Sequence, residues 1–191
     1  MVKFSLICLF AVAALASPLV RHVTVGPARV ELEETTFEAV AKQLGYAPLA
    51  HTGDAGGSRT QVCYATGGTR GARYYLESSE MGGGDRITQV DVVGAGSSTA
   101  AEEPVIASRC RTLASGAGAE RTDRGIRLGL SREAVDRSLA LHGRDSAGVT
   151  LYEKSEDHGT GPSAYNVASW FRVRYASGRV AAFSTGVVSS R

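Results

Sequence analysis

The stretch SREAV, residues 131–135, has a counterpart in the first half of the chain, TFEAV at residues 36–40. Both stretches read hydroxyl, any residue, Glu, Ala, Val, and a leucine follows each of them four residues later, Leu139 and Leu44. A hydroxyl side chain ahead of an acidic residue, at the start of an apolar stripe, is typical of a helix N-terminus. Two copies of one helix start predict two copies of one small structural unit.

The same order of elements surrounds both helix starts. A short extended segment precedes each helix, at 30–32 and at 126–128, and the first helix is expected at 36–44 with Thr35 as its capping residue. Strands are expected after the helices, at 61–64, 73–77 and 87–93 in the first half and at 149–152, 168–175 and 180–188 in the second. The sequence therefore predicts an α+β fold of two tandem units, each a helix plus an antiparallel meander, with the helices packed on one face of the sheet or sheets.

The first sixteen residues have the parts of a secretory signal peptide. Lys3 supplies the charged start, an apolar run follows to Leu15, and residues 14–16 read Ala-Leu-Ala, a small-x-small cleavage site. The run is shorter than the ~20 residues of a membrane-spanning helix, so a single-pass anchor is the alternative, and we expect no transmembrane segment in the mature chain. The expected divisions are a signal peptide at 1–16, a first unit at 17–94, a Gly-, Ala- and Ser-rich linker at 95–124 and a second unit at 125–191. The predicted location is the periplasm or the extracellular medium.

Cysteine usage agrees with export. Cleavage after residue 16 leaves two cysteines, Cys63 and Cys110. An even number of cysteines in an exported chain predicts a disulfide bond. The alternatives are two unpaired buried thiols, or a nucleophilic Cys63 activated by His51.

The second half carries GIRLGLSREAVDRSL at 125–139 and SWFRVRYASGRVAAF at 169–183. These stretches resemble the small bacterial envelope modules typified by BamE (SmpA) and the secreted β-lactamase inhibitor proteins. The resemblance implies helices packed on one face of an antiparallel sheet, a tandem pair of such units, and protein binding in the envelope or outside the cell. The first half departs from the pattern because it lacks a leucine-glycine pair before its helix, and the linker is long.

Composition and motifs exclude several functional classes. The formal net charge of +2 creates no strong field, so we expect no binding to nucleic acid or to acidic lipid. The four histidines have no metal-ligand spacing, and the chain has neither a G-x-S-x-G elbow nor a G-x-x-x-x-G-K phosphate loop. We therefore expect no catalytic residues, no metal site and no cofactor.

The candidate binding surface is the outer face of the predicted sheet. Strand side chains alternate between faces, so the apolar row of the strand at 168–175 should face the helix and leave Trp170, Arg172 and Arg174 outside. Tyr75 aligns with Trp170 in the first unit. Trp, Tyr and Arg are enriched at binding hot spots. The alternative is that Trp170 packs under a loop and the arginines only solvate the sheet.

The sequence thus predicts an exported, non-enzymatic, monomeric protein that binds a macromolecule, as an inhibitor or as an envelope assembly accessory. Its partner would be another protein or an envelope component. One alternative is a periplasmic enzyme, a hydrolase, that uses scattered residues such as His51, Glu80 and Asp85. A purely structural envelope component is a third interpretation.

Overall fold

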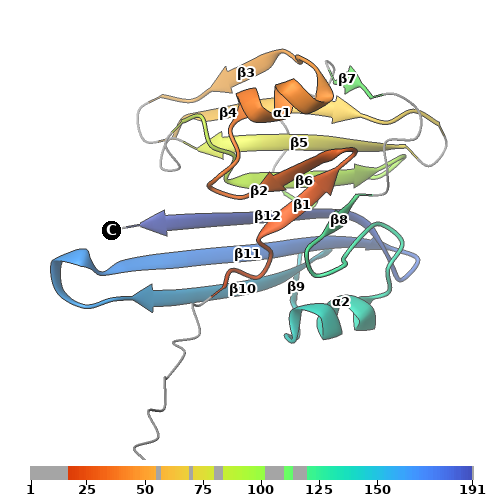
Figure 1. Cartoon of the computed structure of the whole chain (residues 1–191). Coiled ribbons are helices and arrows are strands. Elements are labelled where there is room, and N and C mark those ends of the chain that lie inside the picture. The colour runs from red at the N-terminus through yellow and green to blue at the C-terminus, as the bar shows by residue number, and fades with distance from the viewer. Residues whose placement is uncertain are drawn as a thin grey trace, which may run out of the picture.

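The computed structural model describes residues 17–54, 57–68, 71–79, 84–101, 110–113 and 120–190. The expected signal peptide at 1–16 and the candidate residue Glu80 lie outside these ranges. Strands make up 51% of the described residues and helices 12%. The fold is therefore mostly antiparallel β, and the expected α+β fold of two helix-plus-sheet units is wrong (Figure 1).

One nine-stranded sheet runs through the whole molecule. Its strands follow the spatial order β3 (Leu49–Thr52), β4 (Arg59–Ala65), β5 (Ala72–Ser79), β6 (Gln89–Gly94), β12 (Arg179–Ser190), β11 (Tyr165–Ala176), β10 (Val149–His158) and β9 (Arg144–Ser146). The short strand β7 (Arg111–Thr112) adds to β4 in parallel.

The two halves meet where β6 pairs with β12, with Val92 opposite Phe183. If the two meanders were separate, β6 and β12 would each be an unpaired edge strand. An exposed apolar edge strand can pair with other chains, and the pairing of β6 with β12 prevents this. This pairing is the physical reason that two units become one sheet.

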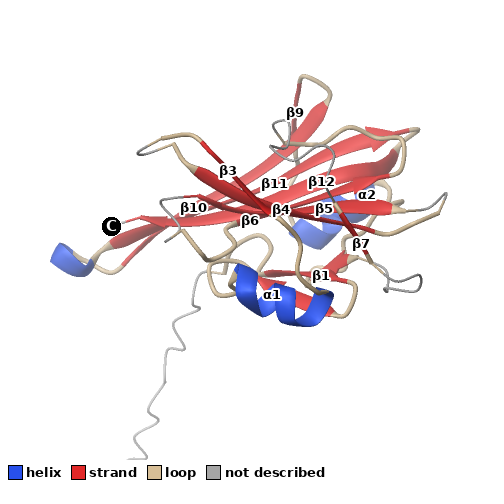
Figure 2. Cartoon of the chain, turned by 90° about the horizontal axis from the view of Figure 1, so that it is seen from above, coloured by secondary structure: helices blue, strands red, loops and turns tan. Residues whose placement is uncertain are grey.

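A second, three-stranded sheet lies on one face of the large sheet. It consists of β1 (His22–Val25), β2 (Ala28–Glu31) and β8 (Arg121–Thr122), in the order β2-β1-β8. Strand β8 belongs to the stretch expected to be a linker, and it pairs with the start of the described chain. Seen from above, this small sheet shares its side of the large sheet with both α-helices (Figure 2).

The two helices begin at the stretches that the sequence singles out. Helix α1 spans Phe37–Leu44 and helix α2 spans Arg132–Leu139, and a single 3-10 turn, η2, spans Gly161–Ser163. The Thr36 hydroxyl accepts the Ala39 N–H at 3.2 Å, so Thr36 caps α1. Thr35, the expected cap, instead accepts the Glu31 N–H at 2.9 Å. Helix α1 ends at Leu44, and the next residue, Gly45, has a positive φ of 83° that favours glycine.

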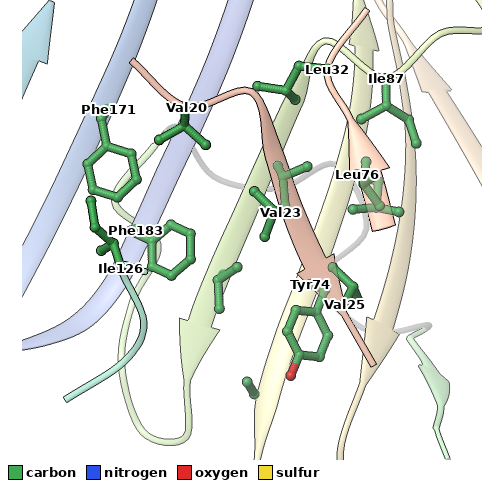
Figure 3. Packing of buried hydrophobic residues seen from close by; sticks show 14 of the residues in the cluster. Val20, Val23, Val25, Leu32, Tyr74, Leu76, Ile87, Ile126, Phe171 and Phe183 are labelled. Atoms are coloured by element: carbon green, nitrogen blue, oxygen red, sulfur yellow. The ribbon is translucent and has the colours of Figure 1, made fainter. Parts of the chain in front are cut away.

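A continuous hydrophobic core fills the space between the large sheet and the layer formed by the helices and the small sheet. It combines residues of both halves, among them Val40 of α1, Val135 of α2, Leu76 of β5 and Phe171 of β11. The Phe171 and Phe183 rings stack with centroids 5.4 Å apart. Figure 3 shows Val20 and Val23 of the N-terminal segment among these side chains. The burial of one shared core explains why neither half forms a separate unit.

Neither of the α-helices in the described ranges has the length and apolar content needed to cross a membrane.

Candidate functional site

The side of the nine-stranded sheet that faces away from α1 and α2 is called here the helix-free face (Figure 2). Directly paired residues on neighbouring strands point to the same face. Two rows of side chains cross its centre: Gln61, Glu77, Gln89, Gly186, Trp170 and Glu153 in one row, and Cys63, Tyr75, Asp91, Ser184, Arg172, Leu151 and Arg144 in the other. The rows combine residues from six or more strands, so only the folded sheet brings them together.

Strand β11 places Trp170 and Arg172 on the helix-free face, as the alternation predicts. Phe171 and Val173 are fully buried in the core on the other side. The Trp170 ring lies directly over Gly186 of β12, where a Cβ atom would come within 2.1 Å of the ring carbon Cζ2. The guanidinium carbon of Arg172 lies 6.0 Å from the Trp170 ring centroid, which is the reach of a cation–π contact. Packing on a glycine and under an arginine thus fixes the indole ring on this face.

Tyr75 is on the same face, but it is not exposed as the sequence suggested. Its side chain is 1% exposed and packs in a second apolar cluster with Cys63, Val93, Ala100 and Ala182. The reason is that residues 95–101 cross back over this half of the sheet. Tyr75 therefore belongs to the protein interior and is removed from the candidate binding residues.

The same crossing segment also binds Arg174. The Arg174 Nε donates a hydrogen bond to the Thr99 carbonyl at 3.0 Å, and Arg73 donates to the Ser97 carbonyl at 3.4 Å. Both arginines thus hold the covering segment onto the sheet. Of the predicted cluster, Trp170 and Arg172 remain together as a partly exposed pair.

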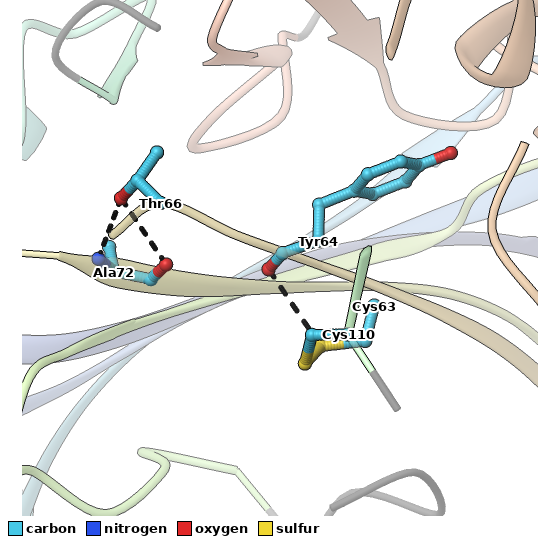
Figure 4. The surroundings of a disulfide bond; sticks show 5 residues. All are labelled: Cys63, Tyr64, Thr66, Ala72 and Cys110. Atoms are coloured by element: carbon cyan, nitrogen blue, oxygen red, sulfur yellow. Dashed lines mark hydrogen bonds between the residues drawn. A yellow bond between two sulfur atoms is a disulfide. The ribbon is translucent and has the colours of Figure 1, made fainter. Parts of the chain in front are cut away.

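The predicted disulfide is present between Cys63 and Cys110, with Cα atoms 4.4 Å apart (Figure 4). It ties Cys110, the residue directly before β7, to the fully buried Cys63 of β4. A disulfide is consistent with an oxidising compartment. Near it, the Thr66 hydroxyl bonds both backbone groups of Ala72 and closes the hairpin between β4 and β5.

A buried polar cluster lies beside Trp170 and Arg172 at the centre of the helix-free face. The Glu77 carboxylate accepts a hydrogen bond from Gln61 Nε2 at 3.1 Å and lies 3.8 Å from the Arg59 guanidinium. The Asp91 carboxylate accepts a hydrogen bond from Gln89 Nε2 at 3.0 Å. Carboxylates are seldom buried unless they are paired, so this cluster is the strongest departure from a purely structural sheet.

Asp91 has a shifted pKa because it is 4% exposed. Burial raises its pKa from 3.8 to about 6, against the lowering effects of Ser184, Gln89 and the more distant charge of Arg172. One carboxylate oxygen, Oδ1, has no hydrogen-bond partner in the described part of the chain. Asp91 is therefore costly to ionise, and it lies on the same face as the pair Trp170 and Arg172. Carboxyl groups with shifted pKa values of this kind are found at functional sites.

This shift predicts how stability depends on pH. Because the folded-state pKa lies above the unfolded value, the folded protein retains the proton longer, and stability is lost as the pH rises from about 4 to about 6. Asp91→Asn cannot ionise at this position and should not show this loss. The unfolding free energy of the variant relative to the wild type should therefore rise by about 3 kcal/mol between pH 4 and pH 7. Urea denaturation at a series of pH values measures this difference. Parallel pH profiles for the two proteins would show that Asp91 is not buried as described.

The structure does not bring together the two described residues of the enzyme alternative, His51 and Asp85. The His51 Nδ1 lies 3.1 Å from the Thr60 hydroxyl on the edge of the sheet. The backbone carbonyl of Asp85 accepts the Phe37 N–H at 3.2 Å, near the start of α1. No contact between described residues joins His51 to Asp85. Within the same ranges, no three His, Cys, Asp or Glu side chains gather closely enough to hold a metal ion.

Sequence reasoning missed Asp91, Glu77 and Gly186. A signal for Asp91 was present, since it is a single carboxylate inside the β-branched stretch QVDVV at 89–93. Glycine within a strand, as at Gly186, often marks the close approach of another group. The identity of those neighbours follows only from pairing between strands distant in sequence.

A shallow hollow of about 350 Å³ opens next to Arg172 on the helix-free face. Its walls are formed by Ala100, Ala101, Ser146, Val149, Leu151 and Arg172. At its rim the Arg144 guanidinium pairs with the Glu153 carboxylate at 2.9 Å. An apolar centre with a charged rim is the usual anatomy of a protein interface.

Comparison of the chain with protein-family models, with curated proteins and with solved structures finds no match. The function therefore has to be argued from the residues and the geometry of this molecule.

Proposed function

We propose that this protein is exported and binds another protein through the part of the helix-free face formed by Trp170, Arg172, Val149 and Leu151. The observation that carries the proposal is the Trp170–Arg172 pair, which lies on a sheet face without helices and next to an apolar hollow. The Arg172 guanidinium is partly exposed, and its contact with the Trp170 ring leaves it on this face of the sheet. Trp and Arg are the residue types that dominate binding hot spots.

The immediate surroundings support a binding role. Gly186 and Arg172 hold the Trp170 ring by packing, and its buried indole Nε1 has no hydrogen-bond partner among the described residues. Leu151 and Val149 are partly exposed beside it and extend the apolar area. A preorganised aromatic side chain loses little conformational entropy when a partner covers it.

The partner is a protein or an envelope component, and the chain acts on it as an inhibitor or as an assembly accessory. Support for export comes from the predicted signal peptide together with the Cys63–Cys110 disulfide. The resemblance of the second half to BamE-like modules and β-lactamase inhibitor proteins favours the same class of function. The half-buried arginine at the centre of the surface favours a partner that presents a carboxylate next to apolar side chains.

The binding prediction is tested by immobilising residues 17–191, oxidised, and passing envelope extract and culture fluid over it. Wild type should retain one partner, and Trp170→Ala with Arg172→Ala should lose it, since truncating hot-spot residues costs 2 kcal/mol or more, roughly a thirtyfold or greater loss of affinity. Tyr165→Ala with Arg137→Ala is the matched control, because it removes an exposed aromatic residue and an exposed arginine elsewhere. A partner retained equally by the double variant, or no partner in either fluid, would overturn the proposal.

A second variant keeps the test independent of truncation. Gly186→Ala keeps the tryptophan at position 170 but should move its ring away from β12, because the added Cβ would overlap the ring. Trp170 is the single tryptophan of the chain, so its fluorescence emission reports this displacement directly. The variant should show shifted emission, an unchanged far-ultraviolet circular dichroism spectrum and weakened partner binding. Full affinity with a displaced ring would exclude Trp170 from the interface.

A further inference from the structure

The surface around Trp170 and Arg172 is closed on one side by the covering segment at 95–101. Along β11, Trp170, Arg172 and Arg174 follow one another on the helix-free face. Trp170 and Arg172 are partly exposed. At the next position along the face, the Arg174 Nε donates a hydrogen bond to the Thr99 carbonyl of the covering segment at 3.0 Å. A polypeptide that lies along β11 over Trp170 would therefore meet this segment directly beyond Arg172.

Positive charge is concentrated at this closed end. Arg172 lines the hollow of about 350 Å³, and Arg174 follows it on the same face. Arg144 lies on β9 in the same cross-strand row as Arg172, and it already pairs with the Glu153 carboxylate at 2.9 Å. The Asp91 carboxylate lies on the opposite side of Arg172 in that row and is only 4% exposed. Three guanidinium groups beside one exposed carboxylate favour an anionic group in the hollow.

The hollow also places apolar side chains next to the Arg172 guanidinium. Leu151 pairs directly with Arg172, and Val149 lines the same hollow. Directly paired residues have Cβ atoms about 5 Å apart, so an occupant that contacts both needs an anionic and an apolar group that close together. The α-carboxylate of a C-terminal residue and its own side chain meet this requirement. Two side chains on the same side of an extended segment are about 7 Å apart, so an internal acidic residue meets it less well.

We infer that the hollow binds the C-terminal residue of the partner protein, with its α-carboxylate on Arg172 and an apolar side chain on Val149 and Leu151. The inference rests on the proposed binding function and specifies which part of the partner the site recognises. The preceding residues of the partner lie over Trp170, and the partner chain ends where the covering segment blocks it. A guanidinium can bind a carboxylate through two parallel hydrogen bonds, and the Ser146 hydroxyl in the wall of the hollow can donate another.

Titration of oxidised residues 17–191 with short peptides, followed by Trp170 fluorescence, tests the inference. The probe is acetyl-Ala-Val-Leu with a free C-terminal carboxylate, and the first comparison is the same peptide with a C-terminal amide. The free acid should bind at least tenfold more tightly, because the amide offers Arg172 no negative charge. Acetyl-Glu-Ala-Leu amide has the net charge of the probe but only an internal carboxylate, and it should bind as weakly as the first amide.

A variant of the guanidinium separates recognition of the carboxylate from packing. Arg172→Gln keeps a long polar side chain next to Trp170 without its charge, so the free acid and the amide should bind it equally. Arg137→Gln removes an exposed arginine of α2 and is the matched control, which should keep the tenfold preference. Equal affinities of the wild type for acid and amide, absence of binding, or a preference that survives in Arg172→Gln would each overturn the inference.

The partner captured from envelope extract or culture fluid distinguishes this inference from the proposed function. Removal of the partner's last residue by a carboxypeptidase should abolish its retention by the wild type. A shortened partner that the wild type still retains, and that Trp170→Ala with Arg172→Ala loses, would support the binding face and overturn recognition of the C-terminus. Tighter binding of octanoate than of the peptide acid would assign the hollow to a small apolar carboxylate and overturn the inference as well.

Discussion

Val40→Asp should destabilise the whole molecule, and not only the half in which it lies. Val40 is 1% exposed on the inner face of α1 and belongs to the core cluster that also contains Phe171 and Phe183. A buried carboxylate without a partner in this core costs roughly 4 kcal/mol or more, a large part of the stability of an ordinary domain. Because both halves contribute to the same core, the variant should lower the unfolding free energy of both halves.

Trp170 makes this prediction specific, since it lies in the second half and Val40 in the first. Denaturant unfolding followed by Trp170 fluorescence and by circular dichroism should give the same lowered midpoint in Val40→Asp. Gln43→Asp, on the exposed side of α1, adds the same charge without burial and should change stability by about 1 kcal/mol or less. An unchanged fluorescence midpoint in Val40→Asp would mean that the halves unfold independently and that the single core is wrong.

Removal of the disulfide should produce a loss of similar size by a different mechanism. The Cys63–Cys110 bond spans a sequence separation of 47 residues. Constraining a loop of that length in the unfolded chain stabilises the folded state by about 4 kcal/mol in the chain-entropy model. Cys63→Ala with Cys110→Ala should lose this amount, and alanine suits the fully buried Cys63 position.

Urea denaturation of the oxidised wild type, the reduced wild type and the double alanine variant provides the comparison. The two proteins without the bond should share one midpoint, and the slope of free energy against urea should rise because the unfolded chain is more open. Peptide mapping without reductant should find one bridged pair. Two thiols that react with an alkylating agent in the native, unreduced protein would contradict the predicted disulfide.

The local features were predictable because short-range chemistry determines them. The stretches TFEAV and SREAV start α1 and α2 at Phe37 and Arg132, since a hydroxyl side chain satisfies a free N–H at each helix start. The alternation along β11 correctly predicted that Phe171 faces inward and Trp170 outward. The cap of α1 was misplaced by one residue, because Thr35 and Thr36 are both hydroxyl residues and only the turn after β2 decides between them.

The features that failed depend on contacts between segments far apart in the chain. Tyr75 was expected on an exposed face, but residues 95–101 cross over it, and nothing in the local pattern of β5 indicates that cover. The polar cluster around Asp91 was missed for the same reason, since its neighbours come from β4, β5, β11 and β12. A residue's chemistry is readable from the sequence, but its neighbours are not.

The sequence by itself indicated where the helices start to within one residue, which side of β11 faces the core, and a disulfide between Cys63 and Cys110. These properties depend on capping, on side-chain periodicity and on a count of cysteines. Only the tertiary structure decided that β6 pairs with β12, which makes one mostly antiparallel sheet of two halves and places Asp91 in the same cross-strand row as Arg172, with Ser184 between them. The physical reason is that backbone hydrogen bonds between strands are the same for every residue type. Burial of the shared core and the satisfaction of both strand edges, not the local sequence, therefore select the partner of each strand.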